Sequence, residues 1–410
     1  MTKTLRNNWK LSATLLFLAS CAIYGSFKLL DGPAKNSTND STVEDLDRLK
    51  ALPYVHWTKK QADSQMKGVT KYDPDRASPG YNLFTNDMTQ IYLMDLEGRI
   101  VHTWNVPGNK KQCEYARMLE NGDLLVICLL QSLVKLDWDS NLLWDRKLHI
   151  HHDIDVLQDR TILALVQERP VRYNSYNVLF DSIIRLSPQG KIQDRWSTFM
   201  QHEKLKRFHP PSALDRPPDS KRPGNFDYYH LNTIQSLPDT PLGKRDKRFQ
   251  RGNLLICLRN VNLIAILDRD SKEVVWAWGS EILDFPHMPT MLSSGNILIF
   301  DNGMRRKYSR VLEINPATKR IVWEYKANPL KKFFSALQGS SQRLPNGNTL
   351  ISESSQGHVF EVNRVGELEW EFWNPVMKEG KRKTIYRFMR VPEEHVRSLI
   401  ARASIKGPRN

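Results

Sequence analysis

Apolar and polar positions follow a repeating pattern from about residue 91 onward. In its outer half, an aliphatic residue and then Asp, Asn or Ser stand seven to nine residues before a tryptophan. The polar residue of each copy is Asp95, Asp137, Ser187, Asp268, Asn315 or Asn363, at intervals of 42, 50, 81, 47 and 48 residues. The tryptophans are Trp104, Trp144, Trp196, Trp276, Trp323 and Trp370. The long interval contains two insertions, at about 199–229 and 239–251. We expect the tryptophans to pack between repeats.

The inner half of the pattern is a polar residue, a Leu five residues later, a turn and an apolar strand. Five clear copies contain the sequences MLENGDLLVICLL, LQDRTILALVQE, RGNLLICLRN, LSSGNILIFDNG and LPNGNTLISESS. Gly supplies the positive φ that tight hairpin turns require. The second copy lacks this Gly, so we expect its turn to differ.

A period in the forties with four short strands per unit is typical of a β-propeller. The first outer half (91–104) has no adjacent inner half, but TIYRFMRVP (384–392) can supply one. Pairing the two chain ends in one blade closes a ring and removes the free sheet edge. The sequence therefore predicts an all-β, six-bladed β-propeller over residues 68–392, preceded by a membrane anchor or signal segment.

The N-terminus contains an uncharged stretch at 11–27, LSATLLFLASCAIYGSF, after Lys3, Arg6 and Lys10. We expect residues 1–30 to be a signal anchor, with residues 31–67 as a polar tether. A lipoprotein signal ending at Cys21 and a cleaved secretory signal are the open alternatives. All three place residues 31–410 outside the cytoplasm, on the periplasmic or cell-surface side. Residues 393–410 form a basic tail, with a short amphipathic helix expected at 391–404.

Composition narrows the classes of partner. The chain has 410 residues, 40% hydrophobic residues and a formal charge of +15, which favours an anionic partner. Nucleic acid conflicts with the predicted location, so none is expected. The four cysteines have no C-x-x-C spacing, which gives no indication of a zinc or thioredoxin-like site. A disulfide framework is not expected in a chain of this size, although a single Cys113–Cys128 bridge is an open alternative.

The position five residues before the inner-half Leu varies between repeats, which is not what a purely structural residue does. The residues there are Glu114, His152, Asn232, His287 and Gly339. His230 precedes Asn232 by two, and Arg259 ends an apolar strand. Such a ring of His, Asn and Arg suits an anion. The alternatives are turn-capping side chains, a salt bridge for Arg259, and zinc bound by three histidines. We expect no metal and no cofactor.

These motifs together resemble the bacterial arylsulfate sulfotransferases, a PAPS-independent family built on a six-bladed propeller. The resemblance covers residues 68–392 and rests on GVTKYDPDRASPGYNLF (68–84), HHDI (151–154), HLN (230–232), CLRN (257–260) and PHMPTMLSSGNILIFDNG (286–303). It implies that His287 is transiently sulfated. It also implies that His152, His230, Asn232 and Arg259 hold the sulfuryl oxygens, with a neighbouring histidine as acid and base.

By the same resemblance, an aryl sulfate ester is the donor and a phenol the acceptor, with ping-pong kinetics. The chain has no GxxxxGK loop, which agrees with a donor that is not a nucleotide. Better known members carry a β-domain before the propeller, for which this chain has little room, so the oligomeric state is left open. Members also carry a disulfide near the active site, and no cysteine pair here was expected to match it. The insertion 199–229 is expected to be a lid or a partner surface.

Two other classes compete with this prediction. A quinoprotein dehydrogenase would need carboxylates for calcium and a Trp stacked over the quinone. A non-catalytic propeller that binds an anionic ligand or a partner protein is the stronger rival. His287 separates the two ideas, because a binding module tolerates Gln at that position and a sulfotransferase does not.

Overall fold

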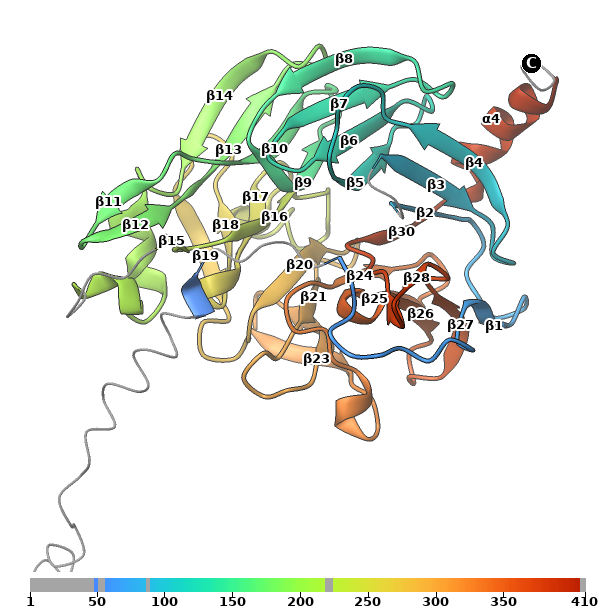
Figure 1. The fold of residues 1–410 in the computed structure, drawn as a ribbon. Coiled ribbons are helices and arrows are strands. Elements are labelled where there is room, and N and C mark those ends of the chain that lie inside the picture. Colours follow the sequence, from blue (N-terminus) through green and yellow to red (C-terminus); the bar gives the residue numbers. More distant parts are fainter. Residues whose placement is uncertain (1–47, 51–55, 86–88, 218–223, 406–410) are drawn as a thin grey trace, which may run out of the picture. The chain divides into compact units, whose positions relative to one another are not determined.

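Short β-strands make up most of the structure, a computed structural model that describes residues 48–50, 56–85, 89–217 and 224–405 (Figure 1). The predictions for residues 1–30 and for much of the tether at 31–67 lie outside these residues. Leu49–Asn410 form one compact unit, which contains every described strand. Over the residues described, no helix is both long enough and apolar enough to span a membrane.

Six antiparallel sheets in the described residues contain four successive strands, and we number them along the chain. The first sheet has β30 (Phe388–Val391), β2 (Tyr81–Thr85), β3 (Gln90–Met94) and β4 (Ile100–Asn105). The second has β5 (Cys113–Met118), β6 (Leu124–Cys128), β7 (Ser132–Leu136) and β8 (Leu142–Lys147). The third has β9 (Ile150–Val156), β10 (Ile162–Gln167), β13 (Asp181–Leu186) and β14 (Ile192–Ser197).

The remaining three sheets follow the same plan. The fourth has β16 (Leu231–Ser236), β17 (Leu254–Leu258), β18 (Leu263–Leu267) and β19 (Val274–Trp278). The fifth has β20 (Pro286–Met291), β21 (Ile297–Asp301), β22 (Arg310–Asn315) and β23 (Arg320–Tyr325). The sixth has β24 (Ser340–Arg343), β25 (Thr349–Glu353), β26 (His358–Val362) and β27 (Leu368–Trp373), with β1 (Gly68–Tyr72) added at its outer edge.

Four of the six tryptophans of the outer pattern link their sheet to the next one. Indole Nε1 of Trp144, Trp276 and Trp323 donates to a backbone carbonyl in the outer turn of the following sheet, over 2.8–3.1 Å. Trp370 of the sixth sheet donates in the same way to the carbonyl of Leu96 in the first, at 2.8 Å. The predicted packing between repeats is confirmed for these tryptophans.

The two ends of the propeller sequence meet in the first sheet. Strand β30 pairs antiparallel with β2, with Phe388 opposite Phe84 and Val391 opposite Tyr81. The prediction that 384–392 supplies the missing inner strand is therefore confirmed. Helix α4 (Glu393–Ile405) follows at once and buries Val396 in the apolar cluster between the first two sheets, where the sequence predicted a short helix.

The inner turn of the third sheet corrects one prediction. Arg160 occupies the position of the missing Gly with φ 62°, close to the 88° of Gly295. Its N–H donates to the carbonyl of Leu157 at 2.9 Å, as the N–H of Gly295 does to that of Leu292. The expectation of a different turn was wrong, because a non-glycine residue can occupy the left-handed region when the hairpin register demands it, at a cost of roughly 1–2 kcal/mol.

The remaining elements are short and lie in connections. They are β11 (Val171–Tyr173), β12 (Tyr176–Leu179), α3 (His202–Leu205), η1 (Lys206–Phe208), η2 (Ala213–Asp215), β15 (Asn225–Asp227), η3 (Lys247–Phe249), η4 (Arg259–Val261), η5 (Leu330–Lys332), η6 (Ser354–Gln356), β28 (Met377–Lys378) and β29 (Lys381–Arg382). In the insertion 199–229, β15 pairs parallel with β12, and Tyr228 donates to Asp215 at 2.8 Å. The insertion therefore ends in a fixed position just before His230.

Candidate active site

Four inner strands carry a β-bulge where the sequence varies between repeats. In β5 the bulge falls at Glu114, and in β16 at Asn232. In β9 three residues, centred on His152, oppose a single residue of β10, and β20 gains one residue just after His287. The inner strands β24 and β30 pair without a shift. Bulges re-aim side chains, and they are common beside active sites.

A chain of close polar contacts joins three histidines and two aspartates. His151 Nδ1 lies 2.7 Å from His152 Nδ1, and His152 Nε2 lies 3.0 Å from His230 Nε2. His230 Nδ1 lies 2.6 Å from a carboxylate oxygen of Asp227. At the other end, His151 Nε2 lies 3.1 Å from Asp181. The chain therefore bridges the third and fourth sheets, with a carboxylate at each end.

Several placements of protons satisfy the contacts in this chain, because either ring can be the donor in each ring-to-ring contact. A carboxylate only accepts, so His230 carries its proton on Nδ1 and His151 carries one on Nε2. In one of these placements His152 donates from Nε2 to His230, and its Nδ1 accepts from His151 Nδ1. In that placement His151 holds two protons and a positive charge, whereas His152 and His230 are neutral.

The electrostatics of the three rings agree with this placement. Burial lowers the pKa of His151, but the charge and hydrogen bond of Asp181 outweigh it and raise that pKa above its ordinary value. Burial and the positive charges around His152 and His230 hold their pKa values well below 6.5. These directions favour the placement with the extra proton on His151, two rings away from Asp227.

His287 lies buried in β20, with only one of its two nitrogens engaged. Nδ1 contacts two acceptors, Oδ1 of Asn302 at 2.7 Å and the carbonyl of Phe285 at 3.1 Å. Asn302 is itself oriented, since its Nδ2 donates to the carbonyls of Ser335 and Gln338. Nδ1 must therefore carry the proton, and the lone pair is on Nε2. Within the described residues Nε2 has no hydrogen-bond partner, although it is buried.

The charge state of His287 follows from its surroundings. Burial, and then the nearby charge of Arg259, lower the pKa of His287 to about 3. The ring is neutral at pH 7, with a buried lone pair and a fixed tautomer. This is the state in which an imidazole nitrogen acts as a nucleophile.

Arg259 and Asn232 have different surroundings. Arg259 donates from Nε to Oδ1 of Asn260 at 3.1 Å, and its guanidinium lies 5.2 Å from the ring centre of Phe285. Asn232 is buried, and its Nδ2 donates to the carbonyl of Pro286 at 3.0 Å. Asn232 therefore helps to position β20, the strand that carries His287.

A cavity of about 910 Å³ lies over this cluster. His152, His230 and Arg259 line it, together with Asp227. His287 and Asn232 are not among its lining residues, and His287 is 2% exposed. A side chain must move before a ligand in the cavity reaches Nε2 of His287.

The residues that orient the histidines were not predicted from the sequence. Asp227 and Asp181 hold the ends of the histidine chain, and Asn302 fixes the tautomer of His287. Asp153 forms a buried ion pair with Arg387 and accepts from the N–H of Ile234 at 3.0 Å, which ties β9 to β16. The HHDI motif contained a signal for Asp153, but its partner is more than 200 residues away.

In the sixth sheet, the position equivalent to His287 is Gly339, and packing explains why it is a glycine. A Cβ atom on Gly339 would lie 2.2 Å from the ring of Phe300, which stands opposite His287 in the fifth sheet. Gly339 therefore leaves room for the ring of Phe300 and adds no polar side chain to the site.

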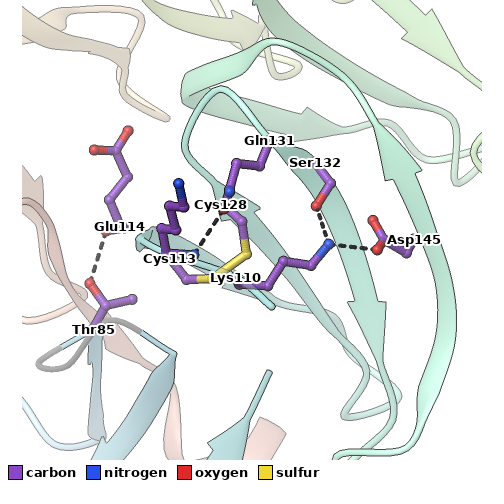
Figure 2. The surroundings of a disulfide bond; sticks show 9 residues. Thr85, Lys110, Cys113, Glu114, Cys128, Gln131, Ser132 and Asp145 are labelled. Atoms are coloured by element: carbon purple, nitrogen blue, oxygen red, sulfur yellow. Dashed lines mark hydrogen bonds and ion pairs between the residues drawn. A yellow bond between two sulfur atoms is a disulfide. The ribbon is translucent and has the colours of Figure 1, made fainter. Parts of the chain in front are cut away.

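A disulfide joins Cys113 to Cys128 across the inner hairpin of the second sheet (Figure 2). It adjoins Glu114, whose carboxylate accepts from the N–H of His152 at 3.4 Å. The expectation that no cysteine pair suits a disulfide near the site was therefore wrong. Unbulged pairing of β5 with β6 would place Cys113 opposite Leu129, and the bulge at Glu114 shifts it by one residue to Cys128.

The repeated four-stranded sheets are those of a β-propeller. Comparison with known protein families identifies the family of the chain. The sequence model described as Arylsulfotransferase (ASST) matches residues 116–375. The chain belongs to the arylsulfotransferase family, and this membership implies arylsulfotransferase activity. No curated protein sequence matches the chain significantly.

Several solved structures resemble the chain at low sequence identity. A protein of unknown function from Bacteroides caccae is 14% identical, with a TM-score of 0.49 over 74% of this chain and 97% of its own. The β-propeller domain of Cps50 (Swd1) from Myceliophteria thermophila is 9% identical, with a TM-score of 0.47 over 81% and 100% of the two chains. A streptogramin B lyase is 13% identical, with a TM-score of 0.42 over 80% and 88%.

Proposed function

We propose that the six sheets are the blades of one closed propeller and that it transfers a sulfuryl group from an aryl sulfate ester to a phenol without PAPS. In this proposal His287 is the nucleophile and a sulfohistidine is the intermediate. The observation that carries it is the buried, unpartnered Nε2 of His287, on a ring whose other nitrogen is held as a donor. Nε2 of the buried His202 and His209 also has no hydrogen-bond partner among the described residues, and the nearby charge of Arg259 distinguishes His287 from them.

The first half-reaction forms a bond between Nε2 of His287 and the sulfur atom. The bond from sulfur to the aryl oxygen breaks, and its electron pair leaves on the phenolate. His152 gives its Nε2 proton to that oxygen and receives the Nδ1 proton of His151, which becomes neutral. In the second half-reaction a phenol returns a proton along the same path, and its oxygen displaces Nε2 from sulfur.

Cationic and N–H groups support the charge on the sulfuryl oxygens. Arg259, His152 and His230 line the cavity, and preorganised donors of this kind lower the barrier to group transfer. Asn232 acts in the proposal both on the sulfuryl group and on the strand of His287. The hydrogen bond between His152 and His230 must open for either ring to contact a substrate oxygen.

The cellular setting is part of the proposal. We infer an extracytoplasmic enzyme, tethered to a membrane through its N-terminal segment and without a nucleic-acid partner. The Cys113–Cys128 disulfide supports this, because such bonds persist in oxidising compartments.

The first test is the release of p-nitrophenol from p-nitrophenyl sulfate in the presence of phenol. The change is His287→Gln, and the control is His395→Gln, a change at an exposed histidine of α4. We expect the wild type and the control to be active and His287→Gln to lose at least about a thousandfold in rate. With donor alone, intact mass should show one added sulfuryl group on the wild type and none on His287→Gln. A fully active His287→Gln would refute the mechanism, and a well-folded but inactive wild type would favour an anion-binding propeller.

A further inference from the structure

The cavity over the histidine cluster is much more cationic than sulfuryl transfer alone requires. Five lysines line it in addition to Arg259, whereas its acidic lining residues are Asp227 and Glu353. Both acids have partners, because Asp227 bonds to His230, and Glu353 bonds to His358 and accepts from the N–H of Phe334. The lysines are therefore not neutralised by these two carboxylates.

Four of these lysines come from two distant segments on the cavity lining. Lys59 and Lys60 lie ahead of β1, and Lys331 and Lys332 lie in η5. All four are exposed, and none forms an ion pair with a residue that the structure describes. Exposed like charges repel one another, and no carboxylate pairs with these four lysines among the described residues. A bound anion would reduce the repulsion between them.

Two aromatic side chains lie among the lysines. Trp57 and Phe334 also line the cavity, and both are half-buried. Neither has a ring partner among the described residues, unlike most aromatic side chains of the sheets. Leu130 and Leu337 add apolar lining. Flat apolar groups with a nearby cation favour aromatic ligands that carry negative charge.

The volume of the cavity also favours a ligand larger than a simple aryl sulfate. Its volume of about 910 Å³ lies near the upper end of the roughly 300–1,000 Å³ of ligand pockets. A simple phenol with one sulfuryl group occupies a small part of such a space. The remaining lining is cationic and aromatic, which sets the chemistry of the rest of the ligand.

We infer that this site selects bulky aryl compounds that carry at least two anionic groups beyond the sulfuryl group being transferred. Lys59, Lys60, Lys331 and Lys332 bind those groups, and Trp57 and Phe334 contact the aromatic rings. This inference rests on the proposed function, because it assumes that substrates of the transfer reaction bind in this cavity. The anionic groups can be sulfonate, carboxylate or phosphate, since each offers the same charge to an ammonium group.

The test measures binding with a probe that cannot be a donor. Naphthalene-1,3,6-trisulfonate and naphthalene-1-sulfonate have carbon–sulfur bonds, so they carry no transferable sulfuryl group. Titration calorimetry on the full chain should show the trisulfonate binding at least about tenfold more tightly than the monosulfonate, with a difference that shrinks as salt is added. Equal binding of the two probes would overturn the inference.

The variants assign the binding to the lysines. The change is Lys59→Gln, Lys60→Gln, Lys331→Gln and Lys332→Gln together, and the control is Lys378→Gln with Lys381→Gln in the β28–β29 hairpin. We expect the fourfold variant to lose the trisulfonate preference while its melting temperature and monosulfonate binding stay unchanged. A retained preference would overturn the inference, as would binding of anionic lipid vesicles through these lysines without binding of the trisulfonate.

The same series separates this inference from the proposed function. If p-nitrophenyl sulfate is not turned over but the trisulfonate preference depends on the four lysines, the transfer mechanism fails and the binding site stands. If transfer to phenol proceeds and the trisulfonate binds no better than the monosulfonate, the transfer stands and the selectivity for anionic aryl compounds fails.

Discussion

At the scale of single residues, the site works by limiting what each histidine can do. Asn302 and the Phe285 carbonyl fix the proton of His287 on Nδ1, and burial keeps the ring neutral. Asp181 acts in the opposite direction on His151, because its charge raises the pKa of that ring. The pKa values of two histidines of one cluster thus shift in opposite directions because their neighbours differ.

Glu114 allows a prediction about pH and stability. Burial raises its pKa from 4.5 to about 7, so between these values the folded protein holds a proton that the unfolded chain has released. Stability contributed by this proton is present at low pH and is lost as pH rises through 7. Glu114→Gln should therefore raise the stability relative to wild type by about 2–3 kcal/mol at pH 8 and by much less at pH 5.

Thermal melts of wild type and Glu114→Gln at the two pH values check this prediction. Gln keeps an oxygen that can accept from the N–H of His152, so the local contact is retained. A difference in melting temperature that is the same at pH 5 and pH 8 would contradict the raised pKa of Glu114.

The sequence identified the histidines but not the groups that orient them. His152 and His287 stand at equivalent positions of a repeat, so a break in the pattern pointed to them. Asp181 and Asp227 lie outside the inner half of the repeat, and Asn302 stands at the repeat position of Arg259 with a different residue type. The contacts of all three depend on the folded structure. The disulfide was left open for a similar reason, since its register depends on a bulge.

At the scale of elements, the repeat specifies the strands, and bulges in four inner strands change the direction of the side chains at the site. Strand pairing and outer turns are nearly the same in every sheet, which is why the sequence predicted them. The bulges in β5, β9, β16 and β20 have no shared sequence signal, because the residues at them differ and the bulge in β9 adds two residues where the others add one. Fold and function are therefore encoded in different features of the same strands.

The tryptophan links between sheets can be tested with a matched pair. Trp370 and Trp104 are both fully buried, but only Trp370 has an acceptor for Nε1 among the described residues. Trp370→Phe should lower the free energy of unfolding by about 1–3 kcal/mol more than Trp104→Phe, because it leaves the Leu96 carbonyl without a donor. Denaturant unfolding of the two variants measures this difference, and equal losses would show that the hydrogen bond adds nothing to ring packing.

At the scale of the whole molecule, the first sheet is built from both ends of the propeller sequence. The sequence predicted this pairing from a simple count, since six outer halves were present and only five clear inner halves. The link from Trp370 to Leu96 adds a second connection between the sixth and first sheets. Loss of either connection should therefore affect the entire fold rather than one blade.

Two truncations test the role of closure. A chain that ends at Pro392 keeps β30 and loses α4, including buried Val396, so it should fold with a stability lower by at least about 1.5–3 kcal/mol. A chain that ends at Arg387 also loses β30 and leaves the edge of β2 unpaired. We expect it to lose cooperative thermal unfolding, measured by circular dichroism. Equal melting temperatures for the two truncations would mean that β30 does not close the fold.

The pairing of β2 with β30 also determines when the protein can fold during its synthesis. Residue 391 leaves the ribosome 306 residues after residue 85, which takes about 15–60 s at the usual rates of translation. Throughout that time the first sheet lacks its inner strand, and β2 offers an open edge to other chains. The complete first sheet can form only when synthesis of this region is finished, so a nascent chain exposes this strand edge until then.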